Sequence, residues 1–355
     1  MRASPLARFL LVAWILLAVY ASLYPLSGWR DAGVSAFAFV AAPWPRYVTV
    51  LDMAMNVAAY LPFGVLCVLA LHPRLRGAGA VVAALAGGAL LSFMLEAAQG
   101  YLPARISSNL DWLCNMAGAL GGALLVTPLA GWLLEAGPLR RLRAATFEAG
   151  AAADLGLVLL GLWLLTQLNP AILLFGLGDL RDLFAAPLGV EQPPALFVSI
   201  ETLTAAANLT AAALLLASIA APNAPLRALV LALVVLALVV KVVAFAILVD
   251  AGGVLAWLTP GAQRGLALGL VLALLSVGLG QVARLVLAAV LLMAATVLVN
   301  LAPPNPYLAA ILSVWSQGHF LNFNGLTRLV SATWPYATLA YLIWLASRRA
   351  RAALG

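Results

Sequence analysis

Apolar residues occur along this chain in ten long runs, separated by short stretches that contain arginine, glycine and proline. A helix of about 20 residues crosses the roughly 30 Å hydrocarbon core of a bilayer, so each run predicts one transmembrane helix. The sequence thus predicts an all-α fold, a polytopic helical membrane protein with about ten transmembrane helices. The predicted spans are 9–26, 52–71, 78–100, 109–134, 150–169, 195–220, 226–249, 263–280, 282–302 and 330–346.

Two of these runs need interpretation. The stretch 263–302 would form a helix about 60 Å long, twice the thickness of the hydrocarbon core. A glycine-containing turn at residues 278–281 predicts that it folds back as a hairpin of two helices. The first run, 9–26, follows two arginines and lacks a clear small-residue cleavage site, so we interpret it as a retained signal anchor.

Composition agrees with a membrane protein and excludes a soluble domain. Of 355 residues, 65% are hydrophobic and only 9% are charged, against about 25% charged in soluble domains. The two cysteines, Cys67 and Cys114, lie in apolar segments and give neither a disulfide framework nor a metal-ligand spacing. The chain has only two histidines. We therefore expect no metal and no cofactor.

The basic residues predict the topology. All but one of the nineteen are arginines, and they lie mainly between the apolar runs, so the net charge of +7 indicates contact with membrane lipids and no nucleic-acid binding. With both termini in the cytoplasm, twelve arginines fall on the cytoplasmic side and six outside, the asymmetry typical of such proteins. A basic cytoplasmic linker at 137–149 divides a four-span domain, 1–136, from a six-span domain, 150–355.

Polar residues of the first half gather at the ends of three predicted spans. They recur at intervals of three or four residues, so those of each span share one helix face, and an Asp within a span costs ~2.5–3.5 kcal/mol. A small-residue seam at Gly118 and Gly122 continues the polar stripe of the fourth span. The candidate ligand-binding residues are Asp52, Asn56, Glu96, Gln99, Arg105, Asp111 and Asn115.

The predicted topology places all three polar ends at the outer face. There they would form a shallow hydrogen-bonding site open to the exterior, with Arg105 in the loop between two spans. The alternative is a network that only holds the helices together, in which Arg105 neutralises Asp111 or Glu96.

The same residues resemble a known pattern. Over roughly residues 6–135 the chain is similar to the VanZ-like family of bacterial membrane proteins. The resemblance implies a four-helix domain in a bacterial inner (plasma) membrane, and a named example of the family lowers susceptibility to the glycopeptide teicoplanin. The family brings no settled enzymatic mechanism, and the six further spans depart from its minimal domain. The matching motifs are Asp52-x-x-x-Asn56, Tyr60-x-Pro62-x-Gly64, Glu96-x-x-Gln99 and Arg105-x-Ser107-x-x-x-Asp111-x-x-x-Asn115-x-x-Gly118.

The second half has charged residues inside two of its spans. Glu201, Thr204 and Asn208 share one face of the sixth span, and Lys241 lies near the middle of the seventh. Because Glu201 and Lys241 lie at similar depths, we predict a buried ion pair between them. The alternative is a proton or ion relay.

Two long outer segments remain, 170–194 and 303–329. The first is predicted to lie along the membrane interface as an amphipathic helix. The second interleaves aromatic and amide side chains, which suits a sugar or an amphipathic headgroup, whereas the alternative is an aromatic belt at the membrane surface. This second candidate site consists of Trp315, Gln317, His319, Asn322, Asn324 and Arg328.

Three functions follow as hypotheses. The leading one is binding of a lipid-linked glycan or an amphipathic glycopeptide antibiotic at the outer face, without catalysis. The second is a membrane hydrolase or transferase in which Asp111 or Glu96 acts as general base, with a divalent cation held by the carboxylates as one variant. The third is a transporter, which the sequence favours least because it has no paired interrupted spans and no phosphate-binding G-x-x-x-x-G-K motif.

Overall fold

The structure, a computed structural model, describes residues 4–31, 33–45, 48–181, 193–248, 253–303, 305 and 321–354. Its regular secondary structure in these ranges is helical, as predicted. The chain divides into two compact units, Met1–Ala145 and Thr146–Gly355, and each is described by itself.

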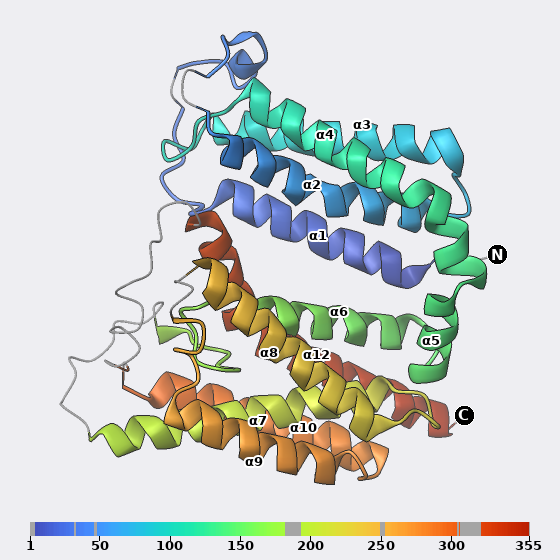
Figure 1. Cartoon of the computed structure of the whole chain (residues 1–355), viewed down its shortest axis with the longest axis vertical. Helices are drawn as coiled ribbons and strands as arrows, with labels where there is room; N and C mark the ends of the chain where they lie inside the picture. The colour runs from blue at the N-terminus through green and yellow to red at the C-terminus, as the bar shows by residue number, and fades with distance from the viewer. Residues whose placement is uncertain are drawn as a thin grey trace. The chain divides into compact units, whose positions relative to one another are not determined.

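The N-terminal unit is a bundle of four long helices, and helices that follow one another in the chain run in opposite directions (Figure 1). Short helical elements lie in its first long loop and after its last long helix. The long helices are α1 Pro5–Leu23, α2 Val50–Leu71, α3 Gly77–Gln99 and α4 Asn109–Val126; the short elements are η1 Ala38–Ala41, η2 Thr127–Leu129, η3 Trp132–Ala136 and α5 Pro138–Thr146.

Helices α2 and α4 pack closely because glycines face the partner backbone. A Cβ atom on Gly118 would overlap the Val57 carbonyl oxygen, and one on Gly122 would overlap that of Leu61. From the other helix, Gly64 faces the backbone of α4 in the same way. The predicted small-residue seam is therefore confirmed, and it fixes how the polar residues at the start of α2 and α4 face each other.

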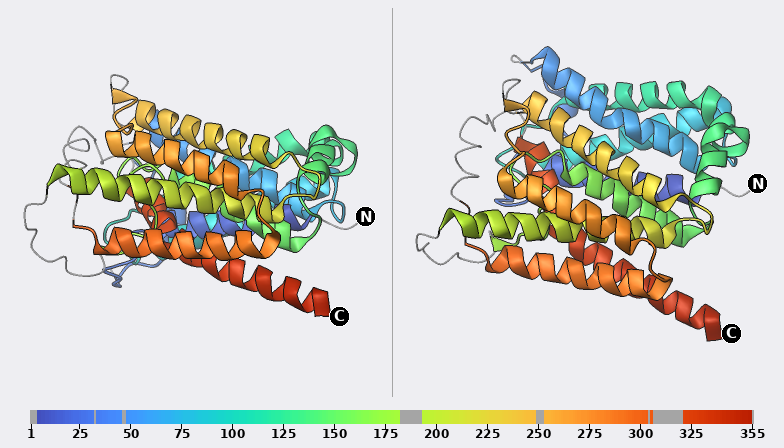
Figure 2. Two further views of the ribbon diagram at one scale, coloured as in Figure 1. Left: turned by 90° about the horizontal axis from the view of Figure 1, so that it is seen from below. Right: turned by 60° about the horizontal axis from the view of Figure 1, so that its bottom comes forward.

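The second unit is built around α7, Pro194–Ile219, most of which is buried. This helix lies between α9 and α10 (Figure 2), while α12 packs against α6. The other helices are α6 Ala151–Thr166, α8 Leu226–Leu248, α9 Pro260–Ser276, α10 Gln281–Leu301 and α12 Leu321–Leu354.

An irregular segment, residues 167–181, lies inside the second unit. None of its residues is exposed, and Phe175 stacks on Trp163 at 5.1 Å between ring centroids. Non-helical chain within a membrane domain is tolerated only where protein or water satisfies its backbone. The expected amphipathic helix along the interface is thus wrong for residues 170–181, and residues 182–192 lie outside the described ranges.

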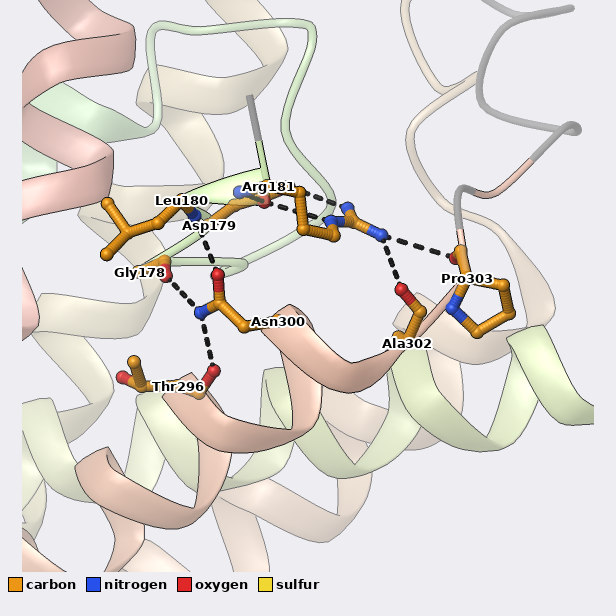
Figure 3. A network of polar contacts seen from close by, with 8 residues as sticks. All are labelled: Gly178, Asp179, Leu180, Arg181, Thr296, Asn300, Ala302 and Pro303. Atoms are coloured by element: carbon orange, nitrogen blue, oxygen red, sulfur yellow. Dashed lines mark hydrogen bonds and ion pairs between the residues drawn. The ribbon is translucent and has the colours of Figure 1, made fainter. Parts of the chain in front are cut away.

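Side chains from the surrounding helices bind the backbone of this segment. Figure 3 shows Asn300, whose amide oxygen accepts from the Leu180 N–H at 2.9 Å and whose amide nitrogen donates to the Gly178 carbonyl. Arg181 forms an ion pair with Asp179 and donates to the Ala302 carbonyl beyond the end of α10. Burial by itself raises the pKa of Asp179, but the hydrogen bonds and positive charge of Arg181 lower it below its usual value.

Each predicted span has a helical counterpart. Eight helices are long and apolar enough to cross a membrane, namely α1 to α4, α7, α8, α10 and α12, whereas α6 and α9 are shorter apolar helices. The predicted hairpin is confirmed, because α9 ends at Ser276 and α10 begins at Gln281. The number of spans that cross the bilayer and the cytoplasmic location of both termini stay predictions.

The glycine seam predicts opposite results at two adjacent positions. Gly121→Ala meets nothing within 4 Å, so we expect a gain of about 0.5–1 kcal/mol from helix propensity. Gly122→Ala must push α2 and α4 apart and should cost about 1–3 kcal/mol. Thermal unfolding of both variants in detergent measures the difference, and equal stabilities would contradict the seam.

Candidate functional site

The start of α2, the end of α3 and the start of α4 meet at one end of the N-terminal unit, which we call the polar end. Asn56 Nδ2 donates to Asp111 Oδ1 at 2.9 Å and joins α2 to α4. Asn115 Nδ2 donates to Ser92 Oγ at 2.9 Å and joins α4 to α3. These four side chains thus form two direct hydrogen bonds between helices.

Glu96, in the last turn of α3, has a buried carboxylate that lies beside the first turn of α4. Its Oε2 accepts from the Ser108 backbone N–H at 2.8 Å. Ser108 is the N-cap of α4, and its hydroxyl oxygen accepts from the Asp111 N–H at 3.2 Å. The free N–H groups and the dipole at a helix N-terminus favour negative charge, so the fold holds the Glu96 carboxylate in a fixed position.

Asp52 and Asp111 occupy the first turns of α2 and α4. Asp52 is exposed and forms a capping box with Thr49, whose hydroxyl donates to Asp52 Oδ2 at 2.6 Å. Asp111 lies within electrostatic range of both Asp52 and Glu96. The polar end therefore carries three carboxylates, which favour ligands that donate hydrogen bonds or carry positive charge.

Arg105 and Gln99 bind the C-terminal end of α1. Arg105 donates to the Tyr24 carbonyl at 2.6 and 3.0 Å and to the Ala21 carbonyl at 3.3 Å. Gln99 Nε2 donates to the Ser22 carbonyl at 2.9 Å. The last carbonyls of a helix lack partners within it, so Gln99 ties α1 to the end of α3 and Arg105 ties α1 to the loop that follows. Burial lowers the pKa of the Arg105 guanidinium.

The loops at the polar end expose large apolar side chains. Ile106, between α3 and α4, is 88% exposed. Trp29 and Trp44, between α1 and α2, are also exposed, as is Tyr101. Phe37, also between α1 and α2, is exposed and stacks on Phe93 of α3 at 5.5 Å between ring centroids. Polar groups beside exposed apolar side chains suit an amphipathic ligand.

Among the described residues, the polar end has no cluster of side chains that is typical of a metal site. Across the described ranges, no group of three or more His, Cys, Asp or Glu side chains is placed to hold a metal ion.

The other end of the N-terminal unit holds a polar cluster that the sequence analysis missed. His72 Nε2 lies 2.8 Å from Glu135 Oε1, and Arg76 pairs with the same carboxylate at 3.0 Å. The hydrogen bond with His72 and the charge of Arg76 lower the pKa of Glu135. The signal in the sequence is an acid after the fourth apolar run and two basic residues between the second and third runs, which alternating helix direction brings to the same end.

The predicted ion pair between Glu201 and Lys241 is wrong. In the described part of the chain these residues form no ion pair; Lys241 Nζ instead donates to the carbonyls of Asn169 and Ile172 at 2.8 and 3.0 Å. Helix α7, which carries Glu201, packs chiefly against α9 and α10. Lys241 on α8 is bound by the irregular segment, whose carbonyls need donors.

Part of the second candidate site falls outside the described residues. These are Trp315, Gln317 and His319, together with the side chain of Asn322. Asn324 is buried and Arg328 is exposed, and both lie in α12, which begins before the predicted span. The grouping of these six residues stays a prediction.

The long apolar helices indicate a helical membrane protein built of two units. The model of the VanZ/LLP1 family matches residues 8–132. The N-terminal unit therefore carries a VanZ-like domain, as its motifs predicted, and no family covers the rest of the chain. Neither the curated proteins nor the solved structures gave a match.

The contacts of Arg105 predict a structural role. Arg105→Gln removes three donated hydrogen bonds at the end of α1 and should cost about 1–3 kcal/mol. Arg30→Gln changes an exposed arginine at the same end and should leave stability within about 0.5 kcal/mol. Thermal unfolding of the two variants checks this, and equal losses would contradict the role of Arg105 at α1.

Proposed function

We propose that the polar end binds the polar part of an amphipathic envelope molecule, a lipid-linked glycan or a glycopeptide such as teicoplanin, at the outer face of a bacterial plasma membrane. The observation that carries this proposal is the gathering of Asp52, Glu96 and Asp111 at one end of the bundle, beside loops with exposed apolar side chains. Sugar hydroxyls and ammonium groups donate to carboxylates, and apolar side chains hold a lipid or an acyl chain.

The negative charge of the polar end limits the chemical groups that a ligand can present to it. Three carboxylates repel a phosphate group, and Arg105 donates hydrogen bonds to the Tyr24 and Ala21 carbonyls at the end of α1. Recognition is therefore proposed to rest on the hydroxyl or amine groups of the ligand. A change in glycopeptide susceptibility would follow if the protein binds the antibiotic or the glycan that the antibiotic recognises.

The outer location rests on the arginines. Arg74 and Arg76 are exposed between α2 and α3, at the end opposite to the polar end, and Arg140 and Arg141 are exposed in α5. Because cytoplasmic loops carry the excess of basic residues, this distribution supports an outward-facing polar end.

The test compares variants of the full chain purified from bacterial membranes. Glu96→Gln and Asp111→Asn keep side-chain size and remove the charge, and Asp31→Asn removes an exposed charge in the loop between α1 and α2. Co-purifying lipids and added teicoplanin are quantified by mass spectrometry. We expect a glycan-bearing lipid or the antibiotic to be retained by the parent and by Asp31→Asn, and to fall about tenfold in the site variants, equivalent to ~1.4 kcal/mol.

Membrane abundance separates binding from helix packing. A binding site loses ligand while the variant still accumulates in the membrane. Unchanged ligand retention in both site variants at normal abundance would contradict the proposal. Loss of the folded protein in both, with no ligand on the parent, would assign these residues to helix packing.

A further inference from the structure

The loop between α1 and α2 contains a short apolar segment, residues 33–45, which includes η1 and which we call the apolar turn. The sequence has no charged side chain from 32 to 45, whereas Asp31 precedes this run and Arg46 follows it. Four large side chains of the turn, Val34, Phe37, Val40 and Trp44, are 65%, 55%, 46% and 66% exposed. A group of exposed apolar side chains marks a contact with another molecule or with a membrane.

The apolar turn packs against the side of the bundle and folds back from its end. Phe37 stacks on Phe93 of α3. Phe39 is buried, and its ring centroid lies 5.5 Å from that of Phe93 and 6.3 Å from that of Trp112 of α4. Phe93 lies six residues before Gln99, the last residue of α3, which is about 9 Å inward along the helix. Figure 1 shows the loop that holds η1 beside the first turns of α4.

The face of α3 that receives the turn is itself apolar and exposed. Leu90 and Met94 share this face with Phe93, because residues three and four apart are neighbours on a helix. Their side chains are 58% and 54% exposed. Helix α3 is long and apolar enough to cross a membrane, so this face is suited to contact acyl chains. The exposed side chains of the turn therefore continue a lipid-facing surface of α3.

The turn also pairs backbone groups of its own. The N–H groups of Ala38, Val40 and Ala42 each donate to the carbonyl three residues earlier. The Asn109 side chain, at the start of α4, donates to the Ala42 carbonyl at 2.7 Å. Backbone groups among acyl chains have no water to bind, so this pairing suits a nonpolar surrounding.

We propose that the apolar turn inserts into the bilayer leaflet at the polar end of the N-terminal unit. Phe37 and Val40 then contact acyl chains, and Trp44 lies at the headgroup interface, where tryptophan is enriched. Glu96 is three residues from Phe93 on α3, so insertion places the polar end at the depth of the lipid headgroups. This proposal depends neither on the orientation of the chain in the membrane nor on the ligand proposed above.

A nitroxide label at Val40→Cys tests the insertion in the full chain, with Cys67 and Cys114 replaced by serine. The protein is reconstituted into vesicles of phosphatidylcholine and phosphatidylglycerol. Electron paramagnetic resonance measures how often the label collides with O2, which concentrates among acyl chains, and with a water-soluble nickel chelate. The controls are Leu90→Cys on the exposed face of α3 and Asp31→Cys, an exposed position just before the turn. We expect the ratio of O2 to nickel collisions at position 40 to match that at 90 and to exceed that at 31 severalfold.

Two results would overturn the proposal. Nickel collisions as frequent at position 40 as at position 31 would place the turn in water. Infrequent collisions with both reagents at position 40 would mean that protein, such as a second copy of the chain, covers the turn. If Val40→Cys does not fold, Ala41→Cys, a smaller change at another exposed residue of η1, decides by the same comparison.

Discussion

A polar backbone group that is buried away from water must find its hydrogen-bond partner within the protein, and the irregular segment of the second unit depends on this constraint most. Residues 167–181 leave the helical conformation and so lose the partners that a helix provides. Lys241, Asn208 and Asn300, from three different helices, bind carbonyls of this segment. The segment thereby joins α7, α8 and α10. Lys241, for which the sequence predicts an ion pair with Glu201, donates to backbone carbonyls of the segment instead.

The N-terminal unit meets the same constraint at its ends. Carboxylates lie at the N-termini of α2 and α4, and Arg105 and Gln99 bind the last carbonyls of α1. These contacts stabilise the bundle and also leave an acidic surface beside exposed apolar loops. One set of residues thus serves both folding and, in the proposed function, ligand recognition.

The sequence predicted those features that follow from periodicity. Apolar runs marked every described long helix, and the glycine spacing of α4 marked its contact with α2. The meeting of the polar ends followed from alternating helix direction. The partners of Lys241 and Arg105 escaped prediction because they are backbone carbonyls, which every residue carries and no residue type marks. The sequence predicts an interfacial helix where the irregular segment lies because a mixture of apolar residues and turn formers is typical of both.

The central claim is that the polar end faces the exterior. The most direct test introduces one cysteine at a time, Ile106→Cys at the polar end and Arg141→Cys in α5, into a chain whose Cys67 and Cys114 are replaced by serine. Both positions are exposed. An impermeant thiol reagent on intact cells should label position 106 and not position 141, with both labelled after lysis. Labelling of position 141 but not 106 in intact cells would contradict the account.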